Sequence, residues 1–105
     1  MNHIEVRTAS HRQMVDITSQ VAAAIDGAGD GICHVYVPHT TAAVVINEHA
    51  DPDVARDLIA AYEAMVPDVH FAHAEGNSDA HLMTTLLGSS VTVPVENGQL
   101  RLGTW

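Results

Sequence analysis

Apolar and polar positions along the chain follow two different periods, and each period predicts one kind of element. Alternation of apolar and polar residues, or a short apolar run bounded by turn residues, is typical of a strand. Five stretches fit this description: residues 3–9, 32–40, 42–48, 89–98 and 99–105. The pair Asn97-Gly98 favours a two-residue hairpin turn between the last two of them. A polar break at His39-Thr40-Thr41 separates the second stretch from the third.

Three other stretches repeat their apolar positions every three or four residues, which predicts helices. In residues 16–31, Ile17, Val21 and Ile25 fall on one face, Asp16 or Thr18 fits the cap, and glycines end the helix.

The clearest helix is expected over residues 50–68. Asp51 fits the N-cap and Pro52 the first helical position, where its missing N–H costs nothing, and Pro67 stops the helix. A shorter helix is expected over residues 78–88, with Asn77 or Ser78 as its cap and Gly88 at its end.

This order of elements predicts one α+β domain over residues 1–105, with a mixed or largely antiparallel sheet and about three helices. The pattern stops at Trp105 with no turn after the last strand. We therefore expect one further strand beyond this residue.

Composition excludes several classes of partner. The chain has no lysine, only four arginines and thirteen acidic residues, for a formal charge of -9. Cationic side chains bind a phosphate backbone by releasing its counterions, and this chain has few of them. Neither nucleic acid nor an anionic membrane is therefore expected as a partner. No apolar run approaches the roughly 20 residues of a membrane span. With a single cysteine, Cys33, and no apolar leader, a cytoplasmic location is expected.

Residues that can bind a metal, transfer a proton or accept a hydrogen bond are concentrated in the nine residues "HAEGNSDAH", from His73 to His81. Asn77, Ser78 and Asp79 can cap the helix that follows, which is the structural interpretation of all three. His81 falls in the first helical turn, where the dipole disfavours a protonated imidazole but leaves a neutral one as a good metal ligand.

A third histidine, His39, ends an apolar strand. A lone histidine there most often bonds a backbone carbonyl, but three neutral histidines and a water would form an open, catalytic-type Zn²⁺ site. Glu48, at the end of the next stretch, could act as a direct ligand or support one.

Long motifs in the chain resemble the YjbQ-like family, also called the secondary thiamine-phosphate synthase family. The resemblance runs from about Cys33 to Trp105 and rests on three segments: "PHTTAAVVINEHADPDVARDL", "HAEGNSDAHLMTTLLGSSVTVPVENG" and "LRLGTW". It implies a homotrimer with a histidine-lined metal site between subunits. In the family a further strand follows "GTW", and this chain lacks that segment.

Carried over residue by residue, the resemblance implies a metal held by His39, His73 and His81. The metal is expected to be Zn²⁺, with Mg²⁺ as the alternative for a phosphorylated substrate. The implied catalytic carboxylates are Glu75 and Glu48, and the implied substrate-binding residues are Thr40, Thr41, Asn77 and Ser78.

The implied reaction is a weak thiamine-phosphate synthase activity, which joins a pyrimidine diphosphate to a thiazole phosphate. Two phosphorylated substrates favour several cations, and this chain has four arginines and no lysine. Two alternatives stay open: a non-catalytic module that binds a metal or small ligand, and a metal-assisted hydrolase of a phosphorylated metabolite.

Overall fold

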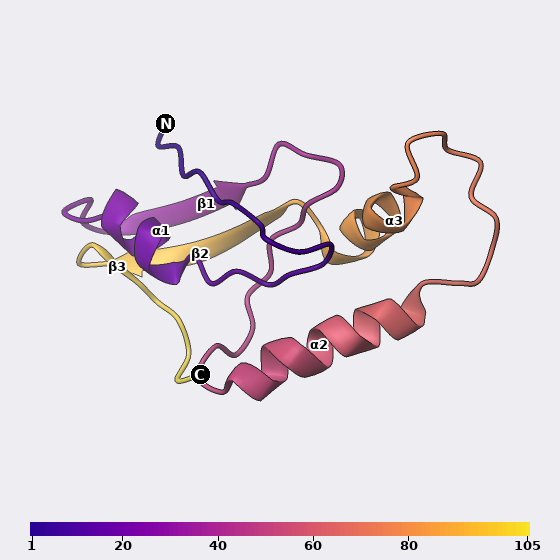
Figure 1. Cartoon of the computed structure of the whole chain (residues 1–105). Coiled ribbons are helices and arrows are strands. Elements are labelled where there is room, and N and C mark those ends of the chain that lie inside the picture. Colours follow the sequence, from indigo (N-terminus) through magenta and orange to yellow (C-terminus); the bar gives the residue numbers. More distant parts are fainter.

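The computed structural model describes all residues, 1–105, and contains three helices and one three-stranded antiparallel sheet (Figure 1). In chain order the elements are α1 (Thr18–Ala24), β1 (Gly31–Tyr36), α2 (Pro52–Met65), α3 (Ser78–Leu87), β2 (Ser90–Glu96) and β3 (Gln99–Leu100). The predicted α+β class with three helices is therefore confirmed.

The sheet has β2 at its centre. β1 pairs with β2 from Gly31↔Val95 to Tyr36↔Ser90, and β3 pairs with the end of β2 through Val95↔Leu100. The predicted hairpin turn is present, with positive φ at Asn97 (53°) and Gly98 (70°), as a type I′ turn requires. The turn is anchored on the loop after α1, because the Gly98 N–H donates to the Gly29 carbonyl at 2.7 Å.

Only four residues of the chain are buried, and none of their side chains is completely buried. The buried set is Val21, Met83, Val93 and Val95, which come from α1, α3 and β2. The Cα radius of gyration is 15.6 Å, against about 13 Å for a typical domain of 100 residues. The protomer is elongated, with extents of 50 × 30 × 22 Å.

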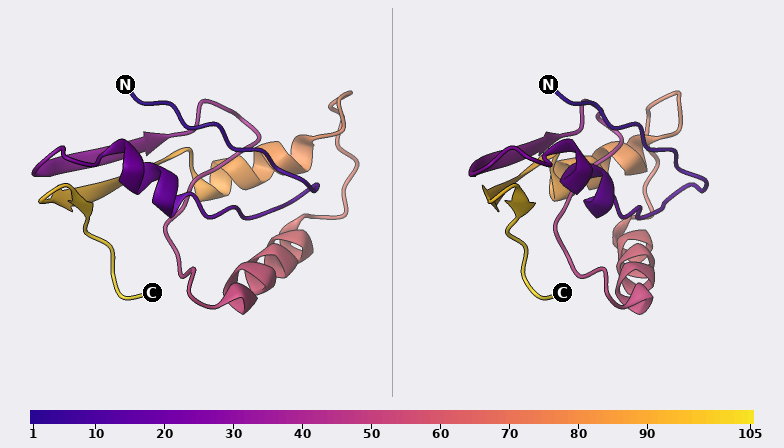
Figure 2. Two further views of the ribbon diagram at one scale, coloured as in Figure 1. Left: turned by 60° about the vertical axis from the view of Figure 1, so that its left-hand side comes forward. Right: turned by 90° about the vertical axis from the view of Figure 1, so that its left-hand side faces the viewer.

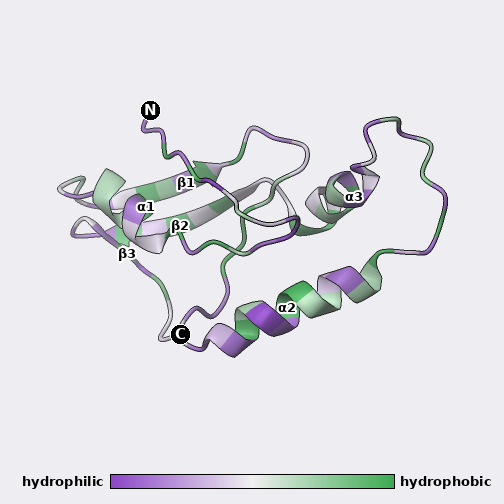
Figure 3. Ribbon diagram, viewed as in Figure 1, coloured by the Kyte–Doolittle hydropathy of each residue, from purple (hydrophilic) through white to green (hydrophobic).

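Helix α2 lies apart from the sheet in all three views (Figures 1 and 2). Asp51 caps it as predicted, accepting a hydrogen bond from the Asp53 N–H at 2.9 Å, and Pro52 is its first residue. Helix α2 contains both apolar and polar residues (Figure 3), and none of them is buried. Its apolar stripe is therefore only partly covered within one chain.

Three strand predictions need correction. Residues 3–9 and 42–48 form no strand, and residues 99–105 form one only at Gln99–Leu100. An apolar–polar alternation becomes a strand only where a neighbouring strand completes its hydrogen bonds, and residues 3–9 are exposed throughout. The segment 42–48 bonds α3 instead, through the Val44 N–H and the Gly88 carbonyl at 3.2 Å.

Two further boundaries also moved. β1 stops at Tyr36, four residues before the predicted end, and the next N–H, of Val37, donates to the Ser89 carbonyl at 2.8 Å. The first helix begins at Thr18, and Asp16 accepts from the Thr18 N–H and hydroxyl at 2.9 and 2.6 Å. None of the helices has the length and apolar character that crossing a membrane requires.

Candidate functional site

A cleft of about 630 Å³ lies between the end of β1 and one face of α3. We call it the β1–α3 cleft. Its lining residues are Tyr36, Val37, Pro38, His39, Thr40, His81, Thr84, Thr85, Gly88 and Ser89. This volume is within the range of roughly 300–1,000 Å³ that is usual for small-molecule sites. Predicted site residues His39, Thr40 and His81 thus share one cleft.

The α3 wall of the cleft follows directly from helical spacing. His81, Thr84, Thr85 and Gly88 stand at positions i, i+3, i+4 and i+7, which is one face of an α-helix. Met83 is on another face and is buried. The helix therefore places its imidazole and hydroxyl groups on the cleft side while another face packs into the core.

The loop before α3 brings His73 back to His81. A turn at residues 73–76 is closed by the Gly76 N–H and the His73 carbonyl at 3.2 Å, and Gly76 has a φ of 72° that favours glycine. The two imidazole rings lie edge to face with centroids 5.6 Å apart and an interplanar angle of 78°.

This ring spacing fits a shared metal. Two imidazoles on one tetrahedral Zn²⁺, with Zn–N bonds of about 2.0–2.1 Å, have ring centres roughly 5 Å apart. The separation of 5.6 Å between the rings of His73 and His81 is close to this value. Within one chain, however, no three His, Cys, Asp or Glu side chains are grouped closely enough to hold a metal ion. His39 lines the cleft with His81 but does not complete a three-ligand set in the protomer.

The other predicted residues divide between the helix start and more distant positions. Asn77 is the N-cap residue of α3, and its side chain makes no capping bond; its Oδ1 is buried without a partner. Ser78 begins the helix and is half-buried. Thr41 is exposed and lies outside the cleft lining.

Neither predicted carboxylate lines the cleft. Glu75 is exposed in the turn between His73 and α3. Glu48 lies beside the C-terminal end of the chain, because the N–H of the next residue, His49, donates to the Trp105 carbonyl at 3.0 Å.

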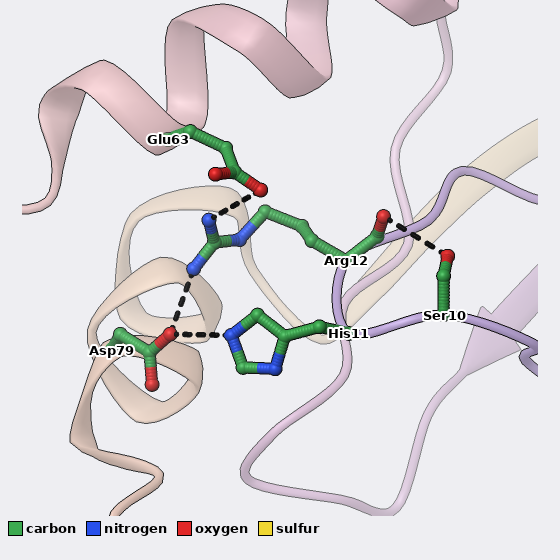
Figure 4. Close-up of polar contacts among 5 residues, drawn as sticks. All are labelled: Ser10, His11, Arg12, Glu63 and Asp79. Carbon is green, nitrogen blue, oxygen red and sulfur yellow. Dashed lines mark hydrogen bonds and ion pairs between the residues drawn. The ribbon is translucent and has the colours of Figure 1, made fainter.

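A charged cluster next to α3 was not predicted (Figure 4). Arg12, in the N-terminal segment, bonds Asp79 of α3 at 2.8 Å through Nη2 and Glu63 of α2 at 3.3 Å through Nη1. The same Asp79 oxygen contacts His11 Nε2 at 3.0 Å. Arg12 thereby connects the N-terminal segment, α2 and α3. Its partner Asp79 lies two residues before His81.

The carboxyl of Asp79 has a lowered pKa. Partial burial raises this pKa, but the hydrogen bonds from His11 and the Ala80 N–H, with the nearby charges of His11 and Arg12, outweigh burial and lower it below 3.8. Asp79 therefore stays ionised and keeps the cluster charged. Asp16 also has a lowered pKa, chiefly because the Thr18 side chain donates to it.

Sequence reasoning missed seven of the ten cleft residues, and those with a side-chain hydroxyl are Tyr36, Thr84, Thr85 and Ser89. The two threonines carried a usable signal, because they stand three and four residues after His81. Arg12 carried none, since its partner Asp79 is 67 residues away in sequence.

With the geometry described, comparison with known proteins identifies the family. Residues 2–105 match the sequence profile described as "UPF0047 protein YjbQ-like". The chain belongs to the YjbQ/UPF0047 family. A UPF0047 protein from Methanocaldococcus jannaschii is 43% identical over 104 residues, covering 96% of this chain and 75% of the relative. The UPF0047 protein YugU from Bacillus subtilis is 42% identical over 106 residues, covering 97% and 80%.

Solved structures of YjbQ-like proteins share this fold. A YjbQ/UPF0047 protein from Clostridium acetobutylicum superposes with a TM-score of 0.89 at 46% identity, covering 95% of this chain and 80% of that one. A similar protein from Sulfolobus solfataricus gives a TM-score of 0.86 at 37% identity, covering 95% and 75%. The fold of this chain is thus the fold of these YjbQ-like proteins.

Proposed function

We propose that this YjbQ-like chain is a cytoplasmic, homotrimeric, metal-dependent transferase with weak thiamine-phosphate synthase activity. One observation carries the proposal. His81 stands at the junction between its ring partner His73 and the cleft lined by His39. A metal held by His81 would therefore lie at the edge of a cleft large enough for a small molecule.

The residues of the site take the following roles. His73 and His81 hold the divalent metal, and His39, from the same copy or a neighbouring one, completes the set. Thr40, Thr41, Asn77 and Ser78 bind substrate oxygens. A metal bound there would neutralise the negative charge of a departing diphosphate. The chain has no lysine that could do the same. Glu75, or else Glu48, moves a proton.

Exposed apolar surface supports the trimer. Ile32 and Tyr36 on β1 are 75% and 63% exposed, and Met65 and Leu86 on α2 and α3 are both 58% exposed. An interface with a second copy would cover large apolar side chains of this kind. Assembly would also bring groups of a second copy toward a pair of histidines that is incomplete in one chain.

One observation favours a second candidate, a non-catalytic module that binds a metal or small ligand. Glu75 and Glu48 both lie outside the cleft lining. A general base has to come within hydrogen-bond reach of the proton it takes, directly or through one water. If assembly does not bring either carboxylate to the cleft, binding without turnover is the better description.

The test separates metal binding from turnover. Tag-free protein is loaded with Zn²⁺, dialysed and analysed for metal, as wild type, His81→Ala, His73→Ala and the control His3→Ala, which changes an exposed histidine of the N-terminal segment. We expect one metal per site in wild type and control, and at least a tenfold lower occupancy in both site variants. Equal occupancy in all four proteins would overturn the proposed metal site.

The same proteins, with Glu75→Gln added, are then given the pyrimidine diphosphate and the thiazole phosphate. Thiamine phosphate, measured by mass spectrometry, is expected from wild type and His3→Ala, and at least about tenfold less from Glu75→Gln. Normal metal binding without product would establish the binding module. Product at the same trace level in every variant would assign the activity to a contaminant.

A further inference from the structure

The β1–α3 cleft has no charged wall. None of its ten lining residues is Lys, Arg, Asp or Glu. Nor is an arginine free nearby: each of the four is paired with a carboxylate, as Arg7–Glu5, Arg12–Asp79, Arg56–Asp53 and Arg101–Glu96. With a formal charge of -9 over the whole chain, the electrostatic potential around the cleft favours cations over anions.

The hydroxyl groups of the α3 wall are oriented as acceptors. Thr84 Oγ1 donates its proton to the Ala80 carbonyl at 3.0 Å, and Thr85 Oγ1 donates to the Leu82 carbonyl at 2.7 Å. A hydroxyl has one proton and two acceptor lone pairs. Both threonines have therefore used their proton inside the helix, and what they retain for a ligand is the capacity to accept hydrogen bonds.

Two backbone donors beside the α3 wall are also engaged, whereas the donors of His39 and Thr40 lie at the β1 end of the cleft. The Val37 N–H bonds the Ser89 carbonyl at 2.8 Å, and the Gly88 N–H bonds the Thr84 carbonyl at 2.9 Å. Pro38 has no N–H. Gly88 is the C-cap of α3, so the cleft reaches the negative end of the helix dipole, which repels anions. The net charge of the chain, the orientation of the two threonine hydroxyls and the direction of the helix dipole therefore all favour a hydrogen-bond donor or a cation at the α3 wall.

We infer that the α3 wall of the β1–α3 cleft, at Thr84 and Thr85, binds a hydrogen-bond-donating, neutral or cationic group of the ligand, such as an amine or an amidine-like amino-heterocycle, in preference to an anionic group. This inference rests on the proposed function only in taking the cleft as the ligand site. Its consequence is that the two ends of a substrate take different positions: the amino end lies against Thr84 and Thr85, and any phosphate lies toward the histidines His39 and His81.

The test uses two probes of the same shape and opposite charge, benzamidine and benzoate, with EDTA present so that no metal takes part. Each is titrated into uniformly ¹⁵N-labelled wild-type protein at pH 7.5 and followed by amide chemical shifts. Benzamidine is expected to move the resonances of Thr84, Thr85, Gly88 and Ser89 in a saturable way. Benzoate is expected to leave them in place at the same concentrations.

Variants show whether the threonine oxygens are responsible. The double variant Thr84→Val/Thr85→Val keeps the shape and removes both acceptors, so benzamidine should bind roughly fivefold or more weakly. Thr84→Ser/Thr85→Ser keeps the hydroxyls and should restore binding to within about twofold. Thr92→Val is the control, since Thr92 pairs with His34 on the sheet, outside the cleft.

Three results would overturn the inference: benzoate binding as tightly as benzamidine, benzamidine shifts spread over the acidic surface away from α3, or equal binding to the valine and serine variants. The metal assays of the preceding section are independent of this titration. Loss of metal binding with selective benzamidine binding would remove the proposed function and leave this inference standing.

Discussion

Replacement of Arg12 tests whether one side chain holds the helices around the candidate site. Arg12→Ala removes the ion pairs to Asp79 and Glu63 at 2.8 and 3.3 Å. The Arg12 and Asp79 side chains are only 15% and 18% exposed, so their charge-assisted bond is worth about 1.5–3 kcal/mol. The Glu63 side chain is 56% exposed, and that pair adds about 0.2–1 kcal/mol.

The expected loss is therefore about 2–3 kcal/mol in the free energy of unfolding. Domains of this size have roughly 5–15 kcal/mol in total, so the change is a large fraction of it. The assay is urea denaturation followed by circular dichroism, with thermal unfolding as a second measurement, where a fall of about 10 °C or more is expected. Protomer concentration is held fixed, because assembly raises apparent stability.

Arg7→Ala is the matched control. It also removes an arginine paired with a glutamate, but Arg7 and Glu5 lie 3.9 Å apart with side chains 90% and 84% exposed. Such a pair contributes close to nothing. Arg12→Ala together with Asp79→Asn completes a double-mutant cycle, in which the coupling should exceed about 1 kcal/mol. If Arg12→Ala and Arg7→Ala are equally stable, the cluster does not hold α2 and α3 together and this reasoning is refuted.

Three further outcomes follow from the structure. The pKa of Asp79 is lowered on folding, so the ionised carboxylate stabilises the folded state above its ordinary pKa of 3.8, and this contribution is lost as the pH falls below 3.8. The free energies of unfolding of wild type and Asp79→Asn should therefore differ at pH 6 and converge toward pH 3. Gly98→Ala should cost more stability than Gly76→Ala in the same denaturation assay. Both glycines have φ near +70°, which costs roughly 1–2 kcal/mol for alanine, but only at Gly98 would the new Cβ lie 3.2 Å from a backbone atom, the Gly27 nitrogen. Light scattering of the whole chain should give three times the protomer mass of 11.2 kDa, and a monomer at micromolar concentration would contradict the proposed trimer.

Local signals predicted the helices well. Asp51 and Pro52 mark the start of α2 by side-chain and ring chemistry that needs no distant partner, and the structure contains that cap. The hairpin at Asn97 and Gly98 was predictable for the same reason, because its positive φ angles depend on those two residues. Where the cause of a conformation is local, the sequence reveals it.

Strands depend on a partner, and there the pattern was insufficient. Residues 42–48 form a mostly apolar run, yet their Val44 N–H bonds the carbonyl of Gly88 at the end of α3 and not a neighbouring strand. The candidate site shows the same limit. Helical spacing could place His81 and Thr84 on one face, but the arrangement of His39 and His73 around them depends on loops whose path no periodicity specifies.

The long span of the contacts around β1 also has a consequence for synthesis of the chain. β1 has no partner until β2 is made, because Gly31 pairs with Val95, and Arg12 lacks the closer of its two carboxylate partners until Asp79 is made. At roughly 5–20 residues per second, translation leaves the N-terminal part waiting for several seconds after it leaves the ribosome. During that interval the unpaired edge of β1 can pair with other chains. Correct folding of the new protein therefore depends on rapid synthesis of the segment that contains β2.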